Sequence, residues 1–188
     1  PDTPHPSYMS KLKITEMERL SADDYRTSAK LPLILVLDSI RSMNNIGSIF
    51  RSADAFRIEG LILCGITAQP PHPDIHKTAL GAEDSVPWRY SSSALEAVGA
   101  LQAEGYTVLA LEQAHESLRL DRFVPEPGAR YALVLGNEVK GVAEEVVAAA
   151  DHCLEIPQYG TKHSLNVSVA AGIALWQLAH PLFPQLDR

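Results

Sequence analysis

The residues best suited to chemistry by type and spacing lie in one stretch, Ile156 to Leu175, which reads IPQYGTKHSLNVSVAAGIAL. Pro157 has no backbone N–H and ends a strand ladder, and Gly160 can take backbone angles that a side chain would forbid, so a loop is predicted here. Ser164 and Asn166 then bring short oxygen-bearing side chains to a helix start, where unpaired N–H groups point outward. The loop is predicted to cradle a ligand, although an ordinary capped core helix after a glycine turn has the same pattern.

A second glycine-rich segment, GNEVKG at residues 136–141, follows an apolar run. It has the spacing of a phosphate-binding loop, but Val142 and Ala143 stand where such a loop requires Lys and Ser/Thr. The G-x-G-x-x-G pattern of a dinucleotide-binding loop is also absent from the sequence. These observations argue against a nucleoside triphosphatase and against a Rossmann-type dinucleotide enzyme.

A third polar group lies in the segment SIRSMNNIGSIFRSADAF, residues 39–56. It contains Asn45, Gly47 and Arg51, and its apolar residues are spaced for one face of a helix: Ile46, Ile49, Phe50 and Ala53. Taken alone, Arg51 is most simply a solvated helix arginine, so its interpretation depends on the other two segments.

Metal and disulfide chemistry have little support in the sequence. His72 and His76 are four residues apart, but the prolines between and before them oppose the regular helix that would align them as metal ligands, so no metal is expected. Cys64 and Cys153 lie far apart without a C-x-x-C pair. Their spacing argues against a disulfide framework or a zinc ribbon and fits a reducing cytoplasm.

The elements that must position these residues alternate between strands and helices. Apolar runs of strand length occur at residues 31–37, 60–64, 107–111, 131–135 and 152–156. Helices are predicted in two short pieces between residues 10 and 30, over residues 39–56, after the capping box of Ser93 and Glu96, from Glu144 and from Asn166. The segment from residue 65 to 88 is predicted to be a long connection. The alternation indicates an α/β domain with a mostly parallel sheet, in which the strand ends near Leu111, Gly136 and Ile156 could meet in one crevice.

Length and charge set limits on the class of protein. The 188 residues suffice for one domain with a substantial core, and the net charge of −7 argues mildly against nonspecific nucleic-acid binding. Residues 1–90 hold ten Lys/Arg against eleven Asp/Glu, whereas residues 91–188 hold six against twelve. A nucleic-acid ligand would therefore be expected in a narrow basic cleft rather than on a broad basic face.

The ends of the chain and its apolar runs suggest a soluble protein. No apolar run approaches the roughly 20 residues of a membrane span, so a cytoplasmic protein without a membrane partner is expected. The Pro-rich residues 1–7 are expected to be unordered, residues 1–30 to form a short helical extension, and residues 31–188 to form the main domain. No large N-terminal domain for binding a nucleic acid is expected in addition to this extension.

Together the three segments resemble the SpoU (TrmH-like) family of RNA ribose 2′-O-methyltransferases, of the SPOUT superfamily. The first motif, N-x-G-x-x-x-R, falls on Asn45, Gly47 and Arg51, the second, G-N-E-V-x-G-V, on residues 136–142, and the third, IP-x-x-G-T-x-x-S-L-N-V-S-V-A, on residues 156–170. The resemblance covers residues 33–178 and implies a C-terminal trefoil knot, in which the last helix passes through an earlier loop.

The resemblance also implies S-adenosylmethionine as cofactor and assigns residues to three roles. Cofactor-binding positions are implied at Leu111, Glu112, Gly136, Asn137, Ile156, Ser164, Leu165 and Asn166. Catalytic positions are implied at Arg51, Asn45, Glu138, Ser164 and Asn166. Glu138 is expected either to hold Arg51 or a group of a partner chain, or to be an ordinary carboxylate at a helix end. Contacts with RNA are implied at Arg41, Arg51, Lys77, Lys162 and His163.

The expected partners are a tRNA or rRNA substrate and a second copy of the chain. A homodimer is expected because the nearly uncharged helix from Asn166 to Ala179 exceeds what one small sheet can cover. Two alternatives stay open at this point: a catalytically inactive SPOUT-like protein that binds RNA or the cofactor, and a different α/β nucleotide enzyme.

Overall fold

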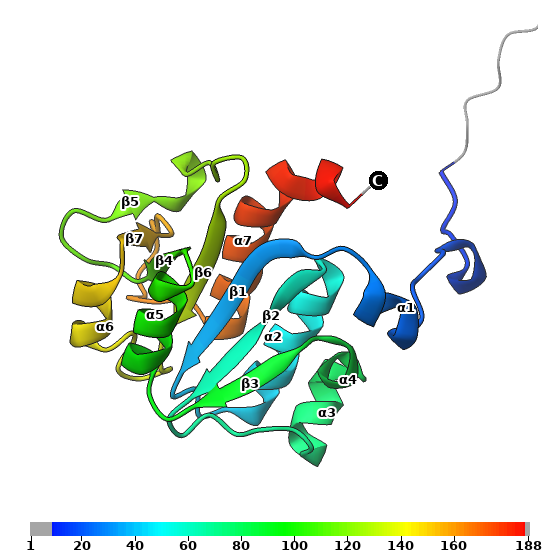
Figure 1. Ribbon diagram of the computed structural model, residues 1–188, viewed down its shortest axis with the longest axis horizontal. Helices are drawn as coiled ribbons and strands as arrows, with labels where there is room; N and C mark the ends of the chain where they lie inside the picture. The colour runs from blue at the N-terminus through cyan, green and yellow to red at the C-terminus, as the bar shows by residue number, and fades with distance from the viewer. Residues whose placement is uncertain (1–8, 187–188) are drawn as a thin grey trace, which may run out of the picture.

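The computed structural model describes residues 9–186 and has a seven-stranded sheet in the order β3-β2-β1-β6-β4-β7-β5 (Figure 1). The strands are β1 (Leu31–Asp38), β2 (Ile58–Cys64), β3 (Trp88–Ser91), β4 (Tyr106–Leu111), β5 (Leu118–Arg119), β6 (Arg130–Leu135) and β7 (His152–Glu155). Every pair of neighbouring strands is parallel. The predicted α/β fold is confirmed, while the knotted path of the chain stays a prediction. The predicted unordered start, residues 1–7, lies outside the described residues.

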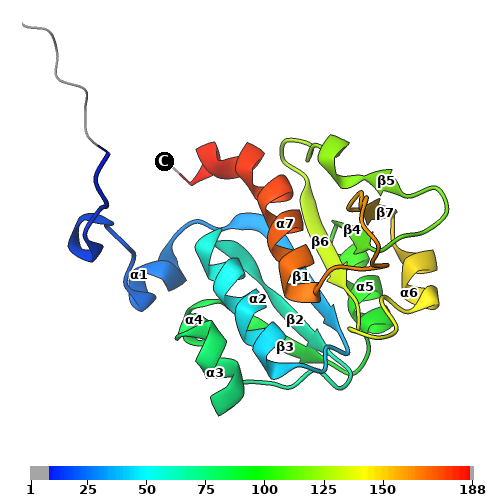
Figure 2. The ribbon, with the colours of Figure 1, turned by 180° about the vertical axis from the view of Figure 1, so that it is seen from behind.

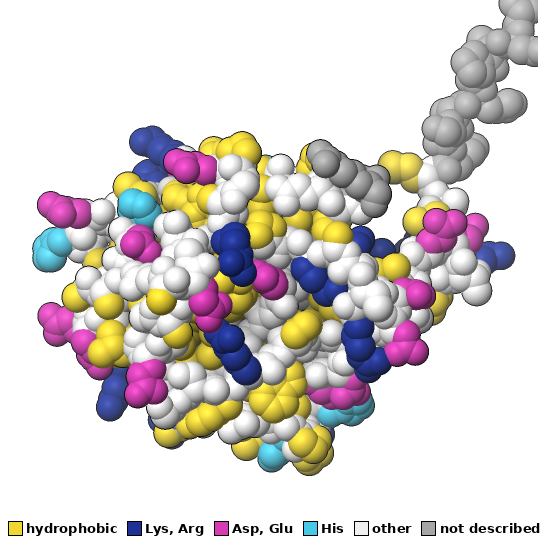
Figure 3. All heavy atoms as spheres, viewed as in Figure 1, with side chains coloured by type: hydrophobic (Ala, Val, Ile, Leu, Met, Phe, Trp, Pro, Cys, Tyr) yellow, Lys and Arg dark blue, Asp and Glu magenta, His cyan; other side chains and the backbone are white. Residues whose placement is uncertain are grey.

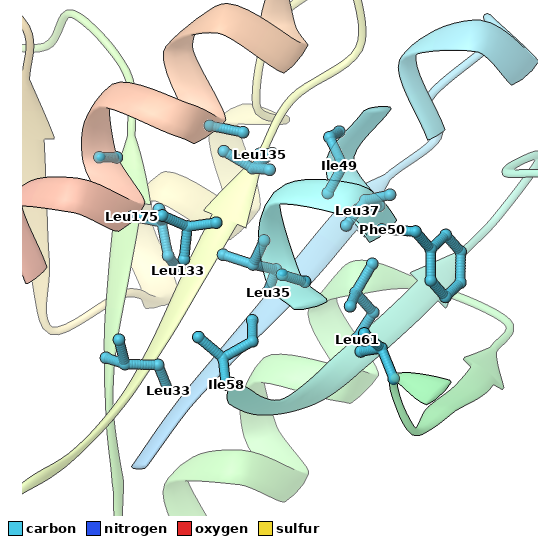
Figure 4. Packing of buried hydrophobic residues seen from close by; sticks show 14 of the residues in the cluster. Leu33, Leu35, Leu37, Ile49, Phe50, Ile58, Leu61, Leu133, Leu135 and Leu175 are labelled. Atoms are coloured by element: carbon cyan, nitrogen blue, oxygen red, sulfur yellow. The ribbon is translucent and has the colours of Figure 1, made fainter. Parts of the chain in front are cut away.

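The central strands are apolar because helices cover both of their faces. Leu33, Leu35 and Leu37 of β1 point to one face, and Val36 points to the other, as the period of two in a strand requires. Leu35 pairs with Leu133 of β6 and with Leu61 of β2. Figure 4 shows the first face, where these leucines pack with side chains from two helices.

One face of the sheet carries α2 (Met43–Ala55), α3 (Pro73–Ala79), α4 (Ala82–Ser85) and α7 (Val167–Ala179), as Figure 2 shows. The opposite face carries α5 (Ala94–Ala103) and α6 (Glu144–Ala149). The remaining helical pieces are η1 (Ile14–Glu16), α1 (Ala22–Thr27), η2 (Leu120–Arg122) and η3 (His180–Gln185). The four predicted apolar residues of α2 are all fully buried.

Several helix starts follow from local capping chemistry, as predicted. The Ser21, Ser93 and Asn166 side chains each accept hydrogen bonds from backbone N–H groups in the first turn of α1, α5 and α7. Asn166, rather than Ser164, is therefore the N-cap of α7.

The prediction of a long irregular connection between residues 65 and 88 is wrong. This segment contains α3, α4 and the edge strand β3. The first of these helices begins at Pro73, where proline is favoured because the first helical N–H has no partner within the helix. The proline at the first helical position thus starts a helix instead of preventing one. Strand β3 escaped detection because it has no apolar run, and two of its four residues, Arg89 and Tyr90, are exposed.

The expectation that no apolar run approaches membrane-spanning length is also corrected. Val167–Gln185, which joins α7 to η3, is 19 residues long and apolar enough to cross a membrane by length and composition alone. A core helix can meet the same criterion, and Leu175 and Leu178 of α7 are buried against the sheet. The other side of α7 is open in the protomer, since Val169, Ile173 and Trp176 are 52%, 42% and 55% exposed.

Candidate active site

A cavity of about 640 Å³ opens at the carboxyl edge of the sheet, where the neighbouring strands β6, β4 and β7 end. Its walls come from residues 111–113, 135–141, 156, 158, 163–167 and 170. Adjacent parallel strands bring their carboxyl ends together, which explains why segments so distant in sequence meet here. All eight residues assigned to the cofactor from the sequence line this cavity: Leu111, Glu112, Gly136, Asn137, Ile156, Ser164, Leu165 and Asn166. Their role as cofactor ligands stays a prediction.

The loop after β6 is a closed turn that only glycines permit. Asn137 and Gly141 exchange two backbone hydrogen bonds, of 3.0 and 2.8 Å, and Asn137 Oδ1 accepts from the Val139 and Lys140 N–H groups inside the turn. A Cβ on Gly136 would lie 2.2 Å from the carbonyl carbon of Gly141. Gly141 itself has φ +69°, a left-handed conformation that favours glycine.

Glu112 holds this loop against the end of β4. Its Oε2 accepts from the Val142 N–H at 3.1 Å, and a Cβ on Gly141 would lie 2.2 Å from the same oxygen. The next residue, Gln113, donates from Nε2 to the His163 carbonyl at 2.5 Å and so ties β4 to the loop before α7. Sequence reasoning missed Gln113, and neither its type nor its spacing singles it out.

Glu138 organises the first and second motifs. Its carboxylate accepts from the backbone N–H groups of Arg41 and Ser42, both at 2.9 Å, and from Asn45 Nδ2 at 3.1 Å. Burial by itself raises the pKa of Glu138, but these donors outweigh it and hold the pKa below its ordinary value of 4.5. The expectation that Glu138 holds Arg51 of the same protomer is therefore wrong. The carboxylate binds the N-terminal turn of α2 instead.

Asn45 and Asn166 join the first motif to the third. Asn166 Nδ2 donates to Asn45 Oδ1 at 3.2 Å, while Asn166 Oδ1 accepts from the Ser168 and Val169 N–H groups that start α7. With Glu138, these two amides form a chain of hydrogen bonds across three sequence segments. Such a chain fixes α2 and α7 relative to the cavity wall.

Arg51 lies on α2, exposed and outside the cavity lining. It shares a helix face with Asn44 and Gly47, because residues three, four and seven apart lie on one side of a helix. Against that face α3 packs closely, since a Cβ on Gly47 would lie 2.3 Å from the Ile75 carbonyl oxygen. Within the protomer the structure thus groups Asn45, Glu138, Ser164 and Asn166 and keeps Arg51 apart.

The expected role of Gly160 is not supported. Gly160 does not have a positive φ, and a Cβ built there would meet no atom within 4 Å. The cavity instead requires a glycine in the second motif, at Gly141. A side chain there would collide with Glu112, which lies at the end of β4.

The candidate RNA contacts differ in their surroundings. Arg41, Lys162 and His163 are at least partly exposed, and His163 lines the cavity. Lys77 forms an ion pair with Asp74, at 2.9 Å on α3. Sequence reasoning missed Lys140, an exposed lysine that also lines the cavity.

His72 and His76, which were considered as metal ligands, contact protein groups instead. His72 Nδ1 accepts from the Asp74 N–H at the start of α3, and His76 Nδ1 contacts Glu83 Oε1 at 2.5 Å. Within residues 9–186, no group of three or more His, Cys, Asp or Glu side chains is placed to hold a metal ion.

Comparisons with known proteins give one consistent result. The model of the SpoU rRNA Methylase family matches residues 32–176. The chain is 28% identical over 176 residues to the 23S rRNA (guanosine-2′-O-)-methyltransferase RlmB of Vibrio parahaemolyticus, covering 92% of this chain and 69% of that protein.

Solved structures of similar proteins agree. The A. aeolicus TrmH/SpoU tRNA modifying enzyme superposes with a TM-score of 0.74 at 26% identity, covering 87% of this chain and 81% of that one. The AdoMet-bound rRNA methyltransferase from Sinorhizobium meliloti gives 0.71 at 28% identity, over 85% of this chain. The chain spans 60% of the length of the latter protein.

Proposed function

The chain belongs to the SpoU rRNA methylase family, and from this premise we propose that it transfers a methyl group from S-adenosylmethionine to a ribose 2′-hydroxyl of rRNA or tRNA. The observation that carries the proposal is the cavity at the carboxyl edge of the sheet, with Asn45, Glu138 and Asn166 hydrogen-bonded beside it. RNA-modifying enzymes act where RNA is processed, and we place this one in the cytoplasm.

The cavity residues fit this cofactor by size and chemistry. About 640 Å³ lies within the range of small-molecule sites, and the walls combine apolar side chains with backbone polar groups. Leu111, Ile156 and Leu165 supply apolar surface for an adenine ring, and Gly136 and Gly141 line the cavity with backbone atoms alone. When bound, the cofactor supplies a methyl group on a sulfonium centre.

The residues of this chain then have to orient a ribose hydroxyl and handle its proton. We assign to Arg51 the stabilisation of the oxygen as its proton leaves, because a guanidinium stays protonated and five N–H donors suit a developing negative charge. An RNA phosphate is a suitable proton acceptor. Asn45, Glu138 and Asn166 hold α2, and therefore Arg51, in a fixed orientation.

A homodimer completes the proposal. Arg51 lies outside the cavity lining of its own protomer, and α7 exposes an apolar stripe of Val169, Ile173 and Trp176. Pairing of two copies through α7 would cover that stripe. It would also bring Arg51 of one copy toward the cavity of the other.

RNA would be held by a small number of cations around the cavity. Arg41, Lys162 and His163 support this assignment by their exposure, and Lys77 would first have to release Asp74. On the face seen in Figure 3, which is the one that α5 covers, basic and acidic side chains are interspersed. The net charge of −7 favours a local RNA contact over a broad one.

The deciding experiment measures transfer of tritium from methyl-labelled S-adenosylmethionine to bulk RNA from cells lacking this gene, followed by mapping of the labelled nucleotide. A ribose 2′-O-methyl group at one position is expected. Binding of the cofactor without transfer to any RNA would identify an inert binding protein instead. Calorimetry with S-adenosylmethionine, nicotinamide dinucleotide and ATP provides the control, and tighter binding of either nucleotide would contradict the proposal.

A further inference from the structure

The turn that leaves β1 is closed by a side chain from a different part of the chain. In an ordinary β-turn over residues 37–40, the Leu37 carbonyl would accept directly from the Ile40 N–H. Here the hydroxyl of Thr67, which follows β2, stands between the two groups. Its Oγ1 accepts from the Ile40 N–H at 3.0 Å and donates to the Leu37 carbonyl at 3.2 Å. Thr67 is 2% exposed, so this hydroxyl is a buried polar group that satisfies two backbone groups of one turn.

The backbone of this turn is strained. Ser39 has φ 55°, a left-handed conformation that is disfavoured for a residue with a side chain. Its N–H donates to the Cys64 carbonyl at 3.2 Å, and the same carbonyl accepts from the Thr67 N–H. Gly65 leaves the space that the serine needs, because a Cβ there would lie 2.4 Å from Ser39 Oγ. Strained residues persist where their surroundings hold them, and they concentrate at functional sites.

The turn contacts two consecutive residues of the second motif. Asn137 Nδ2 donates to the Ser39 carbonyl at 2.7 Å. The Glu138 carboxylate accepts from the N–H groups of Arg41 and Ser42, which follow the turn directly and lead into α2. Both Asn137 and Glu138 line the cavity. The exit of β1 therefore joins the cavity wall to the start of α2.

The inserted hydroxyl sets the width of this turn. Without it, the Leu37 carbonyl and the Ile40 N–H would either stay unpaired in a buried place or close on each other in a direct hydrogen bond. A direct bond would narrow the turn, because no oxygen would then separate the two groups. The Ser39 carbonyl and the N–H groups after it would shift away from Asn137 and Glu138.

We infer that Thr67 is a positioning residue for methyl transfer: it holds the exit of β1 in the open form that aligns α2, and with it Arg51, with the cavity. This inference rests on the proposed function. Thr67 lies outside the cavity lining, so it acts through the turn and not on the substrate or the cofactor. The second-motif loop keeps its shape by its own hydrogen bonds and by Glu112. S-adenosylmethionine affinity should therefore depend little on Thr67.

Two substitutions of Thr67 separate hydrogen bonding from packing. Thr67→Val keeps the shape of the side chain and removes the hydroxyl, whereas Thr67→Ser keeps the hydroxyl and removes a buried methyl group. A role in packing alone predicts that serine is the more harmful change, and the positioning role predicts that valine is.

Single-turnover transfer of tritium from labelled S-adenosylmethionine to RNA from cells lacking the gene measures the rate, and titration of the RNA gives its half-saturating concentration. Calorimetry measures cofactor affinity, and circular dichroism verifies that each variant is folded at the assay temperature. We expect Thr67→Val to lower the rate at saturating RNA about 10²-fold, the effect of misplacing reacting groups by about 1 Å. The half-saturating RNA concentration and the cofactor affinity should stay at wild-type values, and Thr67→Ser should keep most of the wild-type rate.

Thr27→Val is the control, because Thr27 is exposed on α1 and its hydroxyl donates to the Asp24 carbonyl of the same helix at 3.3 Å. It should keep the wild-type rate. A wild-type rate in Thr67→Val, or an equal or greater loss in Thr67→Ser, would overturn the inference while the proposed function stands. A Thr67→Val protein that is unfolded, or one that loses only RNA or cofactor affinity, also overturns it. Absence of transfer by the wild-type protein would overturn the proposed function and the inference with it.

Discussion

Arginine and lysine at position 51 carry the same charge, but only arginine has a planar fork that can contact a hydroxyl and a phosphate together. If Arg51 stabilises the reacting oxygen, Arg51→Lys should lower the rate about 10²- to 10³-fold, or roughly 2.7–4 kcal/mol. Single-turnover methyl transfer at saturating RNA measures the effect, and calorimetry should show unchanged S-adenosylmethionine affinity because Arg51 lies outside the cavity lining. Wild-type turnover in Arg51→Lys or in Arg51→Ala would remove Arg51 from catalysis.

Glu138 predicts how the site responds to acid. Its folded-state pKa lies below the ordinary 4.5, so its stabilising contribution is fully present above that value and is lost as the pH falls through the lower folded pKa. The Arg41 and Ser42 N–H groups need two acceptor oxygens, but the amide of Glu138→Gln has only one. One donor is then left without a partner, which should lower the free energy of unfolding by about 1 kcal/mol. This is the low end for an unsatisfied donor, because the site is partly solvated.

Urea unfolding from about pH 3 to pH 7 measures this contribution. The wild-type protein should lose more stability than Glu138→Gln at the acid end, whereas Glu116→Gln, at an exposed loop residue, should follow the wild-type curve. Parallel curves for all three proteins would contradict the assigned network.

Gly141 and Gly160 form a matched pair of tests for the cavity wall. Gly141→Ala should weaken S-adenosylmethionine binding, because a Cβ meets Glu112 Oε2 at 2.2 Å and the left-handed φ resists a side chain. Gly160→Ala should leave the affinity unchanged, since nothing lies within 4 Å of its Cβ. Calorimetric titration of both variants with S-adenosylmethionine measures the two affinities. A larger loss of affinity in Gly160→Ala would show that the loop of the third motif, and not Gly141, contacts the ligand.

At the scale of elements, the crossing of α2 and α3 depends on one small residue. Gly47→Ala places a Cβ 2.3 Å from the Ile75 carbonyl oxygen and 2.1 Å from Thr78 Oγ1. The helices must then separate, at a cost of about 1–3 kcal/mol in unfolding free energy.

Gly99→Ala on α5 is the control for that crossing. Its Cβ would meet nothing within 4 Å, so alanine should raise the unfolding free energy by about 0.5–1 kcal/mol through helix propensity alone. Chemical denaturation of both variants gives the comparison. A stabilised Gly47→Ala would show that α3 does not pack as closely on α2 as the structure indicates.

At the scale of the whole molecule, the open face of α7 predicts self-association. Ile173 is 42% exposed in the protomer, so Ile173→Glu should leave the fold intact while placing a charge in the proposed dimer interface. Light scattering at about micromolar concentration should give a dimer for the wild-type protein and a monomer for the variant. Leu95→Glu on α5 is the matched control and should stay dimeric. A monomeric wild-type protein would contradict the proposed dimer.

The features of this protein that depend on local chemistry could be predicted from its sequence. Apolar runs predict the buried central strands, because both faces of those strands are covered, and side-chain oxygens at Ser93 and Asn166 predict helix starts that the structure confirms. Because parallel strands end at one edge, the same reasoning predicts that segments near Leu111, Gly136 and Ile156 meet, and they line one cavity.

Contacts between residues far apart in the sequence could not be predicted and became visible in the folded protein. Glu138 binds N–H groups 96 and 97 positions away, and Asn45 meets an amide 121 positions away, so no local pattern reports these contacts. The glycine that the cavity needs is Gly141 rather than Gly160 because the Glu112 carboxylate from another strand occupies the space beside it. The backbone preference of a residue depends on its own type and on its neighbours in sequence. The space available to its side chain depends on which distant segments the order of strands places beside it.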